Sequence, residues 1–305
     1  MDLKISTIYS NTYINKLIYF NHGMVVAKSS VNPVLSPHTA GVLMLKRSTL
    51  LLAVTTTLSA LMLPTFANAD ALADIKKAGV IKIAIPQDFP PFGTVGTDLK
   101  AQGYDIDVAK LIAQDLGVKL QLVPVTSANR IPYLTTKKVD LVISSLGKNP
   151  EREKVIDFVG PYAPFYNGVF GQKNVSVKSA ADLAGKTIAV TRGSIEDLEL
   201  SKVAPSSTTI KRFEDNNSTV SAFYSGQVNL IATGNVVAGT LSKHFSKKPL
   251  ETKFIIKNSP CYIGLNKGET ALQNKLTAII KTAKGNGQLN RISVQWLGTP
   301  LPKQL

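Results

Sequence analysis

Hydrophobic and polar positions along most of the chain follow two alternating patterns, one typical of buried strands and one typical of amphipathic helices. Residues 80–85 form a short apolar run that ends at a proline-rich turn, which predicts a buried strand. Between 104 and 116, apolar residues recur at helical spacing, and Gly117 is expected to end this helix. Over 118–122 apolar and polar residues alternate, which predicts the next strand.

The same alternation continues toward the C-terminus. Further strands are expected at 139–143, 186–190, 208–212, 228–232 and 252–256, and further helices at 131–136, 196–202, 217–225 and 236–244. One face of a last helix carries Leu272, Leu276, Ile279, Ile280 and Ala283. Strands that alternate with helices of this length predict parallel sheets, and two such series predict two α/β lobes. Because ligands of these sheets bind beyond the carboxyl ends of the strands, we expect a site there.

The N-terminal segment has the pattern of an export signal. Lys46-Arg47 precedes an uncharged, leucine-rich run over 48–69, which Pro64 interrupts, and Ala67-Asn68-Ala69 supplies small residues at alternate positions. This order predicts a cleaved signal peptide at 44–69, and therefore a secreted, periplasmic protein. A membrane anchor is the alternative, but it needs about 20 predominantly apolar residues, and threonines, a serine and the proline interrupt this run.

Met44 stands just before Leu45-Lys46-Arg47, the basic start of this signal, so we expect translation to begin there. Residues 1–43 are then a start-site artefact, and the alternative is a disordered extension. In either case the mature protein is expected to begin near Asp70.

The composition of the 305-residue chain argues against several kinds of site and partner. With one cysteine, Cys261, an internal disulfide is impossible, and with three histidines a zinc site is not expected, since zinc sites draw mostly on Cys and His. The formal net charge is +15, but the lysines are scattered singly or in pairs, so no nucleic-acid partner is expected. The charge indicates either a solvated basic surface or a field that attracts anionic solutes. We expect no metal and no cofactor.

Two segments that follow predicted strands carry candidate binding residues. In the first, Asp88 and Phe89 precede two prolines that hold the aromatic rings in place, which favours a stacking wall for a ligand at Phe89. For Phe92 of the same turn, ligand contact and core packing are equally good interpretations. In the second, Ser127 precedes Arg130, which could reach a carboxylate or be a plain surface residue.

A third segment begins at Ser144 and ends at Arg152. Asn149 suits a helix N-cap and Pro150 the first helical position, so Arg152 is expected in the first turn of a helix. There the macrodipole disfavours a cation by about 0.3–1 kcal/mol, which indicates an anionic partner that a guanidinium can clamp with two hydrogen bonds. The alternative is a salt bridge to a nearby acid such as Glu151 or Asp157.

A fourth segment lies between a predicted strand and a predicted helix. Ser194 and Asp197 form a capping-box pattern, and Gly193 lets the backbone approach another group closely. Free N–H groups at a helix start bind anions, but plain capping explains the same residues without any ligand.

The order of these segments, from QDFPPFG through NRIPYLTTKKVDLVISSLGKNPEREKVIDFVGPY to GKTIAVTRGS, resembles solute-binding proteins of the polar amino-acid class, the periplasmic receptors of ABC importers. The resemblance covers about residues 75–300 and is most specific over 129–162. It implies an α/β fold of the type II periplasmic binding protein kind: two lobes, each a mostly parallel sheet flanked by helices, joined by a two-segment hinge near Tyr166 and Asn258. Lobe 1 would hold 70–166 plus 258–305, and lobe 2 would hold 167–257.

Carried over from that family, Arg152 matches the arginine that binds the ligand's α-carboxylate. Phe89 matches the stacking aromatic, and Ser145 a residue whose backbone and hydroxyl contact the ligand. Gly193-Ser194-Ile195 matches the anion-binding turn of the second lobe. Three further matches concern polar side chains. Ser127 and Arg130 match positions that glutamate/aspartate receptors of the family use to bind the side-chain carboxylate of the ligand, and Asn216 matches a position of a polar contact to the ligand.

Two departures from the family concern glycines. Gly147 stands where the family often has Ser or Thr, and Gly234, followed by Asn235, stands where it usually has an acid for the α-ammonium. Either Asp88 supplies that charge or the ligand has no amine. The complete set of expected ligand-binding residues is Asp88, Phe89, Ser127, Arg130, Ser144, Ser145, Gly147, Arg152, Gly193, Ser194, Ile195, Asn216, Gly234 and Asn235.

The resemblance implies a monomeric, non-enzymatic receptor that captures a small polar or acidic amino acid, or a related small carboxylate. Lobe closure would bring Arg152 and the helix start at Ser194 onto the same carboxylate, and the closed form would deliver the ligand to an ABC permease of the inner membrane. Two alternatives stay open: a periplasmic dehydratase-like enzyme on the same scaffold, and a ligand-sensing domain of a membrane receptor.

Overall fold

Two five-stranded sheets organise the part of the chain that this computed structural model describes, residues 71–305. The expected signal peptide at 44–69 and the preceding residues 1–43 lie outside the described residues. In the first sheet the strands run in the order β5 (Lys119–Pro124), β1 (Val80–Ile85), β6 (Leu141–Leu146), β13 (Cys261–Asn266) and β7 (Ile156–Ala163). In the second the order is β10 (Thr209–Phe213), β9 (Thr187–Thr191), β11 (Leu230–Gly234), β8 (Tyr166–Gly171) and β12 (Glu251–Asn258).

Each sheet has the same pairing pattern. The first three strands in each order pair in parallel, and the last two are joined by antiparallel pairs. Strand β6 is buried along its whole length, which fits its apolar first half because a strand inside such a sheet is covered on both faces. A third, small sheet contains β2 (Asp88–Phe89), β3 (Gly93–Val95) and β4 (Ala101–Gln102).

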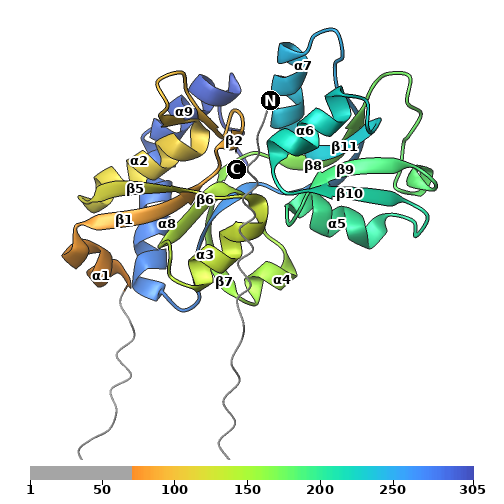
Figure 1. Cartoon of the computed structure of the whole chain (residues 1–305). Helices are drawn as coiled ribbons and strands as arrows, with labels where there is room; N and C mark the ends of the chain where they lie inside the picture. The colour runs from red at the N-terminus through yellow and green to blue at the C-terminus, as the bar shows by residue number, and fades with distance from the viewer. Residues whose placement is uncertain (1–70) are drawn as a thin grey trace, which may run out of the picture. The chain divides into compact units, whose positions relative to one another are not determined.

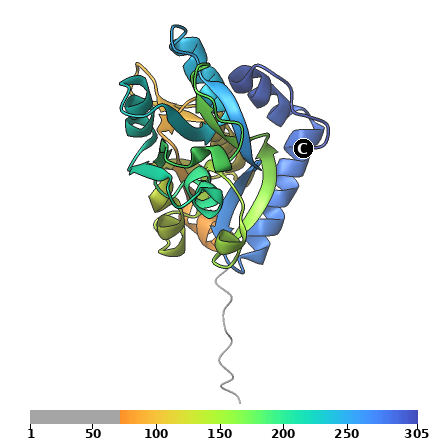
Figure 2. The ribbon, with the colours of Figure 1, turned by 90° about the vertical axis from the view of Figure 1, so that its right-hand side faces the viewer.

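Helices pack around the two sheets (Figure 1). The first sheet is accompanied by α1 (Ala71–Ala78), α2 (Tyr104–Leu116), α3 (Arg130–Thr135), α4 (Pro150–Glu153), α8 (Thr270–Gly285) and α9 (Gln288–Leu297). The second is accompanied by α5 (Ile195–Val203), α6 (Asn216–Tyr224) and α7 (Asn235–His244). Figure 2 shows the blue helix α8 beside the green strand β7, which it contacts. Two 3₁₀ turns, η1 (Ser127–Asn129) and η2 (Ala181–Leu183), complete the fold.

We call the first sheet with its helices lobe 1 and the second with its helices lobe 2. The chain passes from β7 of lobe 1 to β8 of lobe 2 through residues 164–165, and returns from β12 to β13 through 259–260. Strand β8 begins at Tyr166 and β12 ends at Asn258, the residues near which connecting segments were expected. The lobe limits given in the Sequence analysis remain a prediction.

Several elements differ from the sequence expectation. Strands β7, β8 and β13 were not expected, and with β12 they make each sheet partly antiparallel. The strand expected at 139–143 is observed at Leu141–Leu146, so Ser144 and Ser145 lie within β6 rather than after it. Their sheet partner β13 comes from the far end of the chain, and local periodicity cannot show such a partner. The helix expected from 104 to 116 is observed with these limits, and Gly117 ends it in the left-handed conformation (φ 69°).

Among residues 71–305, no helix is long and apolar enough to cross a membrane. The same residues contain no cluster of three or more His, Cys, Asp or Glu side chains placed to hold a metal ion. Cys261 is fully buried in β13, and burial raises the pKa of its thiol.

Candidate functional site

A small cavity lies between the two lobes, where the carboxyl ends of several strands meet. Its volume is about 10 Å³, which is the space of roughly one water molecule. Lobe 1 contributes Phe89, Ser127, Arg130 and Ser145, and the first crossing, the connection from β7 to β8 through residues 164–165, contributes Phe165. Lobe 2 contributes Thr191, Ser194, Ile195, Glu196, Asn216, Ala232 and Thr233. A ligand larger than water therefore requires the lobes to separate from this arrangement.

Arg130 provides the cation of this cavity. The chain leaves β5, forms the turn η1 and places Arg130 at the start of α3, where the side chain is 5% exposed. One guanidinium nitrogen, Nη2, donates to Oγ of Ser127 over 2.6 Å, and Nε is buried without a hydrogen-bond partner. Burial lowers the pKa of Arg130, an effect that the nearby carboxylates of Glu196 and Asp105 oppose. A buried guanidinium with an unmet donor is suited to an anionic ligand group.

Ser145 is held in place by a buried carboxylate behind it. The backbone N–H and the Oγ of Ser145 both donate to Oδ2 of Asp105, over 2.7 and 3.0 Å, and the hydroxyl of Tyr162 donates to Oδ1 over 2.7 Å. Ser145 has a φ of 45°, in the left-handed region that favours glycine, and the two bonds to Asp105 hold it there. Asp105 is fully buried, and burial raises its pKa to about 6. The sequence analysis did not single out Asp105.

On the other side of the cavity lies the turn before α5. The sequence allowed two interpretations of this turn, anion binding and plain helix capping, and the structure shows the capping. Ser194 is the N-cap, and its Oγ accepts from the N–H of Asp197 over 3.1 Å. The N–H of Gly193 donates to Oδ2 of Asp197 and that of Ser194 donates to the carbonyl of Thr191. The amides of Gly193 and Ser194 are thus already bonded within the turn. Contact with a ligand anion by this turn remains a prediction.

Five residues that line the cavity were missed from the sequence: Phe165, Thr191, Glu196, Ala232 and Thr233. Glu196 lies in the first turn of α5, is 4% exposed, and its Oε1 accepts from Nδ2 of Asn167 over 2.7 Å. An acid in a first helical turn looks like a complement to the helix dipole, so nothing in the sequence distinguished Glu196. Phe165 lies in the crossing between the lobes, with its ring centroid 6.2 Å from that of Phe89 and 5.3 Å from that of Phe92.

The two glycines that depart from the family pattern lie where other groups approach the backbone closely. A Cβ at Gly147 would stand 2.5 Å from Oγ of Ser259 and 3.1 Å from Cγ1 of Ile195. A Cβ at Gly234 would overlap the ring of Phe165. Position 234 therefore excludes a larger side chain in this arrangement, whereas position 147 would require Ser259 and Ile195 to shift, and neither glycine lines the cavity.

Arg152 lies beside the cavity but does not line it. As expected, Asn149 caps α4, with its Oδ1 accepting from the N–H of Arg152 over 2.9 Å. The guanidinium donates to the carbonyl oxygens of Gly147 (2.6 Å) and Gly193 (3.0 Å), and burial lowers its pKa to about 10, with repulsion from Arg130 as a further cause. The suggested salt bridge of Arg152 to Glu151 or Asp157 is wrong: these acids pair with lysines of other elements. Because Gly193 belongs to lobe 2, lobe separation would release Nη2 of Arg152, while Nη1 would keep its bond to Gly147 of lobe 1. The expected role of Arg152 on a ligand carboxylate remains a prediction.

Of the other expected residues, Asp88 and Asn235 have hydrogen-bond partners within the protein and the side chain of Ser144 has none. Oδ2 of Asp88 accepts from the backbone N–H of Asn216 over 2.7 Å, and Oδ1 accepts from its Nδ2 over 2.9 Å, which joins the lobes. Asn235 begins α7, and its Oδ1 accepts from the N–H of Tyr166 over 3.0 Å. Ser144 is buried in β6, and its Oγ has no hydrogen-bond partner. Asp88, Ser144 and Asn235 do not line the cavity.

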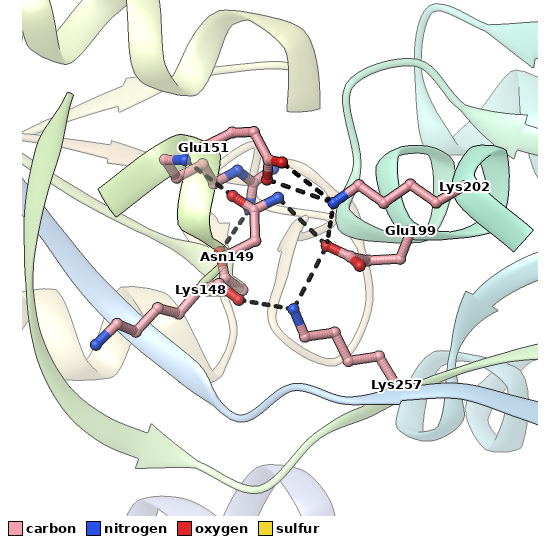
Figure 3. Close-up of polar contacts among 8 residues, drawn as sticks. Lys148, Asn149, Glu151, Glu199, Lys202 and Lys257 are labelled. Atoms are coloured by element: carbon pink, nitrogen blue, oxygen red, sulfur yellow. Dashed lines mark hydrogen bonds and ion pairs between the residues drawn. The ribbon is translucent and has the colours of Figure 1, made fainter. Parts of the chain in front are cut away.

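A polar cluster also joins the lobes outside the cavity (Figure 3). Nζ of Lys202 in α5 lies 3.4 Å from carboxylate oxygens of both Glu151 in lobe 1 and Glu199 in lobe 2. Nζ of Lys257 donates to the carbonyl of Lys148 over 3.1 Å. The lobes thus touch through charged groups, of which Lys202 and Glu151 are exposed to solvent and Glu199 and Lys257 are partly buried.

Comparison with known proteins agrees with this architecture. The family of bacterial extracellular solute-binding proteins, family 3, matches residues 81–299. The ABC transporter glutamine-binding protein GlnH of Bacillus subtilis is 28% identical over 233 residues, which cover 75% of this chain and 85% of GlnH. The fold of the present chain is also that of a cysteine-binding protein from Campylobacter jejuni, with a TM-score of 0.71 and 25% identity. The match covers 77% of this chain and 96% of the cysteine-binding protein. A third relative is the ancestral amino acid-binding protein AncCDT-1, a precursor of cyclohexadienyl dehydratase (TM-score 0.68, 29% identity, 74% and 99% covered).

Proposed function

Because the chain belongs to the bacterial extracellular solute-binding proteins, family 3, we propose that it is the periplasmic binding component of an ABC importer for a small amino acid. The fold is that of type II periplasmic binding proteins, as the resemblance implied. In this proposal the lobes close on a small polar or acidic amino acid, or a related small carboxylate. The closed form, a monomer, then delivers the ligand to an inner-membrane permease.

The observation that carries the proposal is the buried guanidinium of Arg130, which faces an interlobe cavity with an unmet hydrogen-bond donor. Hydroxyl groups of Ser127 and Ser145 from lobe 1 and of Ser194 and Thr233 from lobe 2 surround the same cavity. A ligand carboxylate on Arg130 would therefore contact both lobes at once. Contacts made only in the closed form are what shifts an equilibrium toward closure.

The first test is a thermal-shift screen of amino acids and small organic acids against the purified chain. A ligand at a hundredfold excess over its dissociation constant adds about 2.7 kcal/mol of stability, which raises the melting temperature measurably. Arg130→Gln should weaken binding of the best ligand by tenfold to more than a hundredfold, since each charge-assisted hydrogen bond contributes about 1.5–3 kcal/mol. Arg291→Gln, which removes an exposed cation of α9, is the matched control. Equal affinity of both variants would contradict the proposal.

The dehydratase-like alternative needs an acid or base in the cavity, and Glu196 is a carboxylate at such a place. Incubation of the chain with prephenate separates the two functions. Stoichiometric binding of an amino acid without turnover of prephenate supports the receptor, and product formation that Glu196→Gln abolishes would support the enzyme.

A further inference from the structure

We infer that the turn at the end of α7 is a docking surface for an anionic phospholipid bilayer. We call residues 243–248, with the sequence KHFSKK, the basic turn; its first two residues, Lys243 and His244, are the last two of α7. Figure 1 shows α7 at the top of lobe 2. The inference adds an interaction surface to the proposed function and does not depend on which ligand the cavity binds.

Positive charge in this region has no acid to balance it. Between Asp215 and Glu251 the sequence contains no aspartate or glutamate, whereas the basic turn supplies three lysines and a histidine. Residues 243–247 are all exposed. None of the ion pairs within residues 71–305 involves Lys243, Lys247 or Lys248. A run of unpaired lysines attracts a negatively charged surface.

An aromatic side chain lies within the basic turn. Phe245 is 37% exposed, and among residues 71–305 it is the only exposed aromatic residue. Its ring centroid lies 4.0 Å from that of Tyr224 and 4.7 Å from that of His244, so neighbours cover part of the ring and the remainder faces solvent. Lysines beside an exposed phenylalanine are typical of segments that lie on a membrane, where the charges stay at the headgroups and the ring enters the apolar boundary.

Hydrogen bonds hold the basic turn in place. The N–H of Phe245 donates to the carbonyl of Leu241 over 2.8 Å, and the N–H of Lys248 donates to the carbonyl of Phe245 over 2.9 Å. Nζ of Lys248 donates to the carbonyl oxygens of Phe223 and Tyr224, at the end of α6, over 3.2 and 3.1 Å. The exposed ring therefore stands on an ordered turn, so contact with a surface requires little further ordering of the chain.

Helix termini explain only part of the basic turn. Lys243 lies in the last turn of α7, where a cation complements the helix dipole, and Lys248 bonds the last carbonyls of α6. Neither role needs Lys247, an exposed phenylalanine or the absence of acids over 216–250. An anionic bilayer matches all three features, because its headgroups are negative and an apolar layer lies directly beneath them.

Vesicle sedimentation tests the inference. The purified chain would be mixed at low salt with vesicles that contain phosphatidylglycerol and phosphatidylcholine, and separately with vesicles of phosphatidylcholine alone. We expect binding to the anionic vesicles to be stronger by about tenfold or more. This preference should disappear at about 1 M salt, where the screening length falls to about 3 Å. Every variant keeps residues 1–70, so any binding by that segment is common to all of them.

Three variants locate the binding surface. Lys243→Gln combined with Lys247→Gln should weaken binding to the anionic vesicles by about tenfold or more, since each lysine near such a surface contributes roughly fivefold. Phe245→Ser should weaken it by about threefold or more without a change of charge. Lys76→Gln combined with Lys77→Gln is the matched control: it removes two exposed lysines from α1 and should change binding by less than about twofold.

Equal losses in the two double-lysine variants would overturn the inference, because binding would then follow net charge and not the basic turn. Equal binding of the unaltered chain to both kinds of vesicle would overturn it as well. Poly-L-glutamate represents an acidic protein surface, and binding to it without binding to the anionic vesicles would assign the basic turn to a protein partner instead. Ser246→Glu places a carboxylate at an exposed position of the basic turn and should weaken vesicle binding. This variant decides the inference even if a lysine or phenylalanine variant does not fold.

Discussion

The carboxyl group of Asp105 lies fully buried behind the cavity and supports Ser145, so its charge links stability to pH. Burial raises its pKa to about 6, whereas an aspartate in an unfolded chain titrates near about 3.9. Folding therefore favours the protonated form. The stabilising contribution is complete below about pH 4 and is lost as the pH rises through about 6, at a cost of up to about 3 kcal/mol.

Asp105→Asn should remove this part of the pH dependence. The asparagine oxygen can still accept from Ser145, and burial raises the pKa values of the neighbouring Tyr104, Tyr162 and Cys261, which moves them away from this range. Urea unfolding between about pH 4 and pH 7 should show the unaltered chain losing stability relative to the variant as the pH rises. Parallel stability curves would show that Asp105 does not titrate in this range.

Ser194, the N-cap of helix α5, also lines the cavity. Substitution separates the two roles. Ser194→Ala should lower the free energy of unfolding by about 0.5–2 kcal/mol, as loss of an N-cap does. Ser194→Asp restores a good N-cap and should restore stability, but its negative charge in the cavity should weaken binding of a carboxylate ligand at least tenfold. Chemical unfolding and calorimetry measure the two effects.

Asp215, the N-cap of α6, provides the control for that test. Its Oδ1 accepts from the N–H of Ser218 over 2.7 Å, outside the cavity. Asp215→Ala should cost similar stability with little change in affinity. If Ser194→Asp binds the ligand as well as the unaltered chain, Ser194 acts only as a cap.

The caps also show what the sequence can predict at the level of elements. Asn149 and Ser194 were predicted as caps because capping depends on residues three positions apart, and both are observed. Strands β8 and β13 were missed because their pairing depends on segments far away in the chain.

The residues of the cavity likewise divide into those that the local sequence predicts and those that depend on distant segments. Phe89, Arg130 and Ser145 follow or end strands whose carboxyl ends meet, so a strand-end rule brings them together. Phe165 lies in a crossing whose position depends on both lobes, and Glu196 resembles an ordinary helix-start acid. Only the three-dimensional arrangement distinguishes these two residues from their equivalents elsewhere in the chain.

For the two lobes as a whole, direct contacts decide how easily the cleft opens. The bonds of Asp88 to Asn216 and of Arg152 to the carbonyl of Gly193 join the lobes, as does the ion pair of Lys202 with Glu151. These contacts need no ligand, so they lower the differential affinity that a ligand must supply to keep the lobes closed. Of these contacts, the ion pair of Lys202 with Glu151 is the one that a single charge substitution can turn from attraction into repulsion. It is exposed and lies outside the cavity, so this substitution leaves the lining of the cavity unchanged.

Lys202→Glu should therefore open the cleft of the chain in the absence of added ligand. The new carboxylate would stand beside Glu151 and Glu199 in place of the cation that now bridges them, and repulsion between the lobes should enlarge the radius of gyration measured by small-angle scattering. At about 1 M salt the screening length falls to about 3 Å, so the variant should return toward the radius of the unaltered chain. Lys275→Glu makes the same charge change beside Asp115 within lobe 1 and should leave the radius unchanged. An unchanged radius of Lys202→Glu at low salt would mean that the buried bonds of Asp88 and Arg152 are sufficient to hold the lobes together.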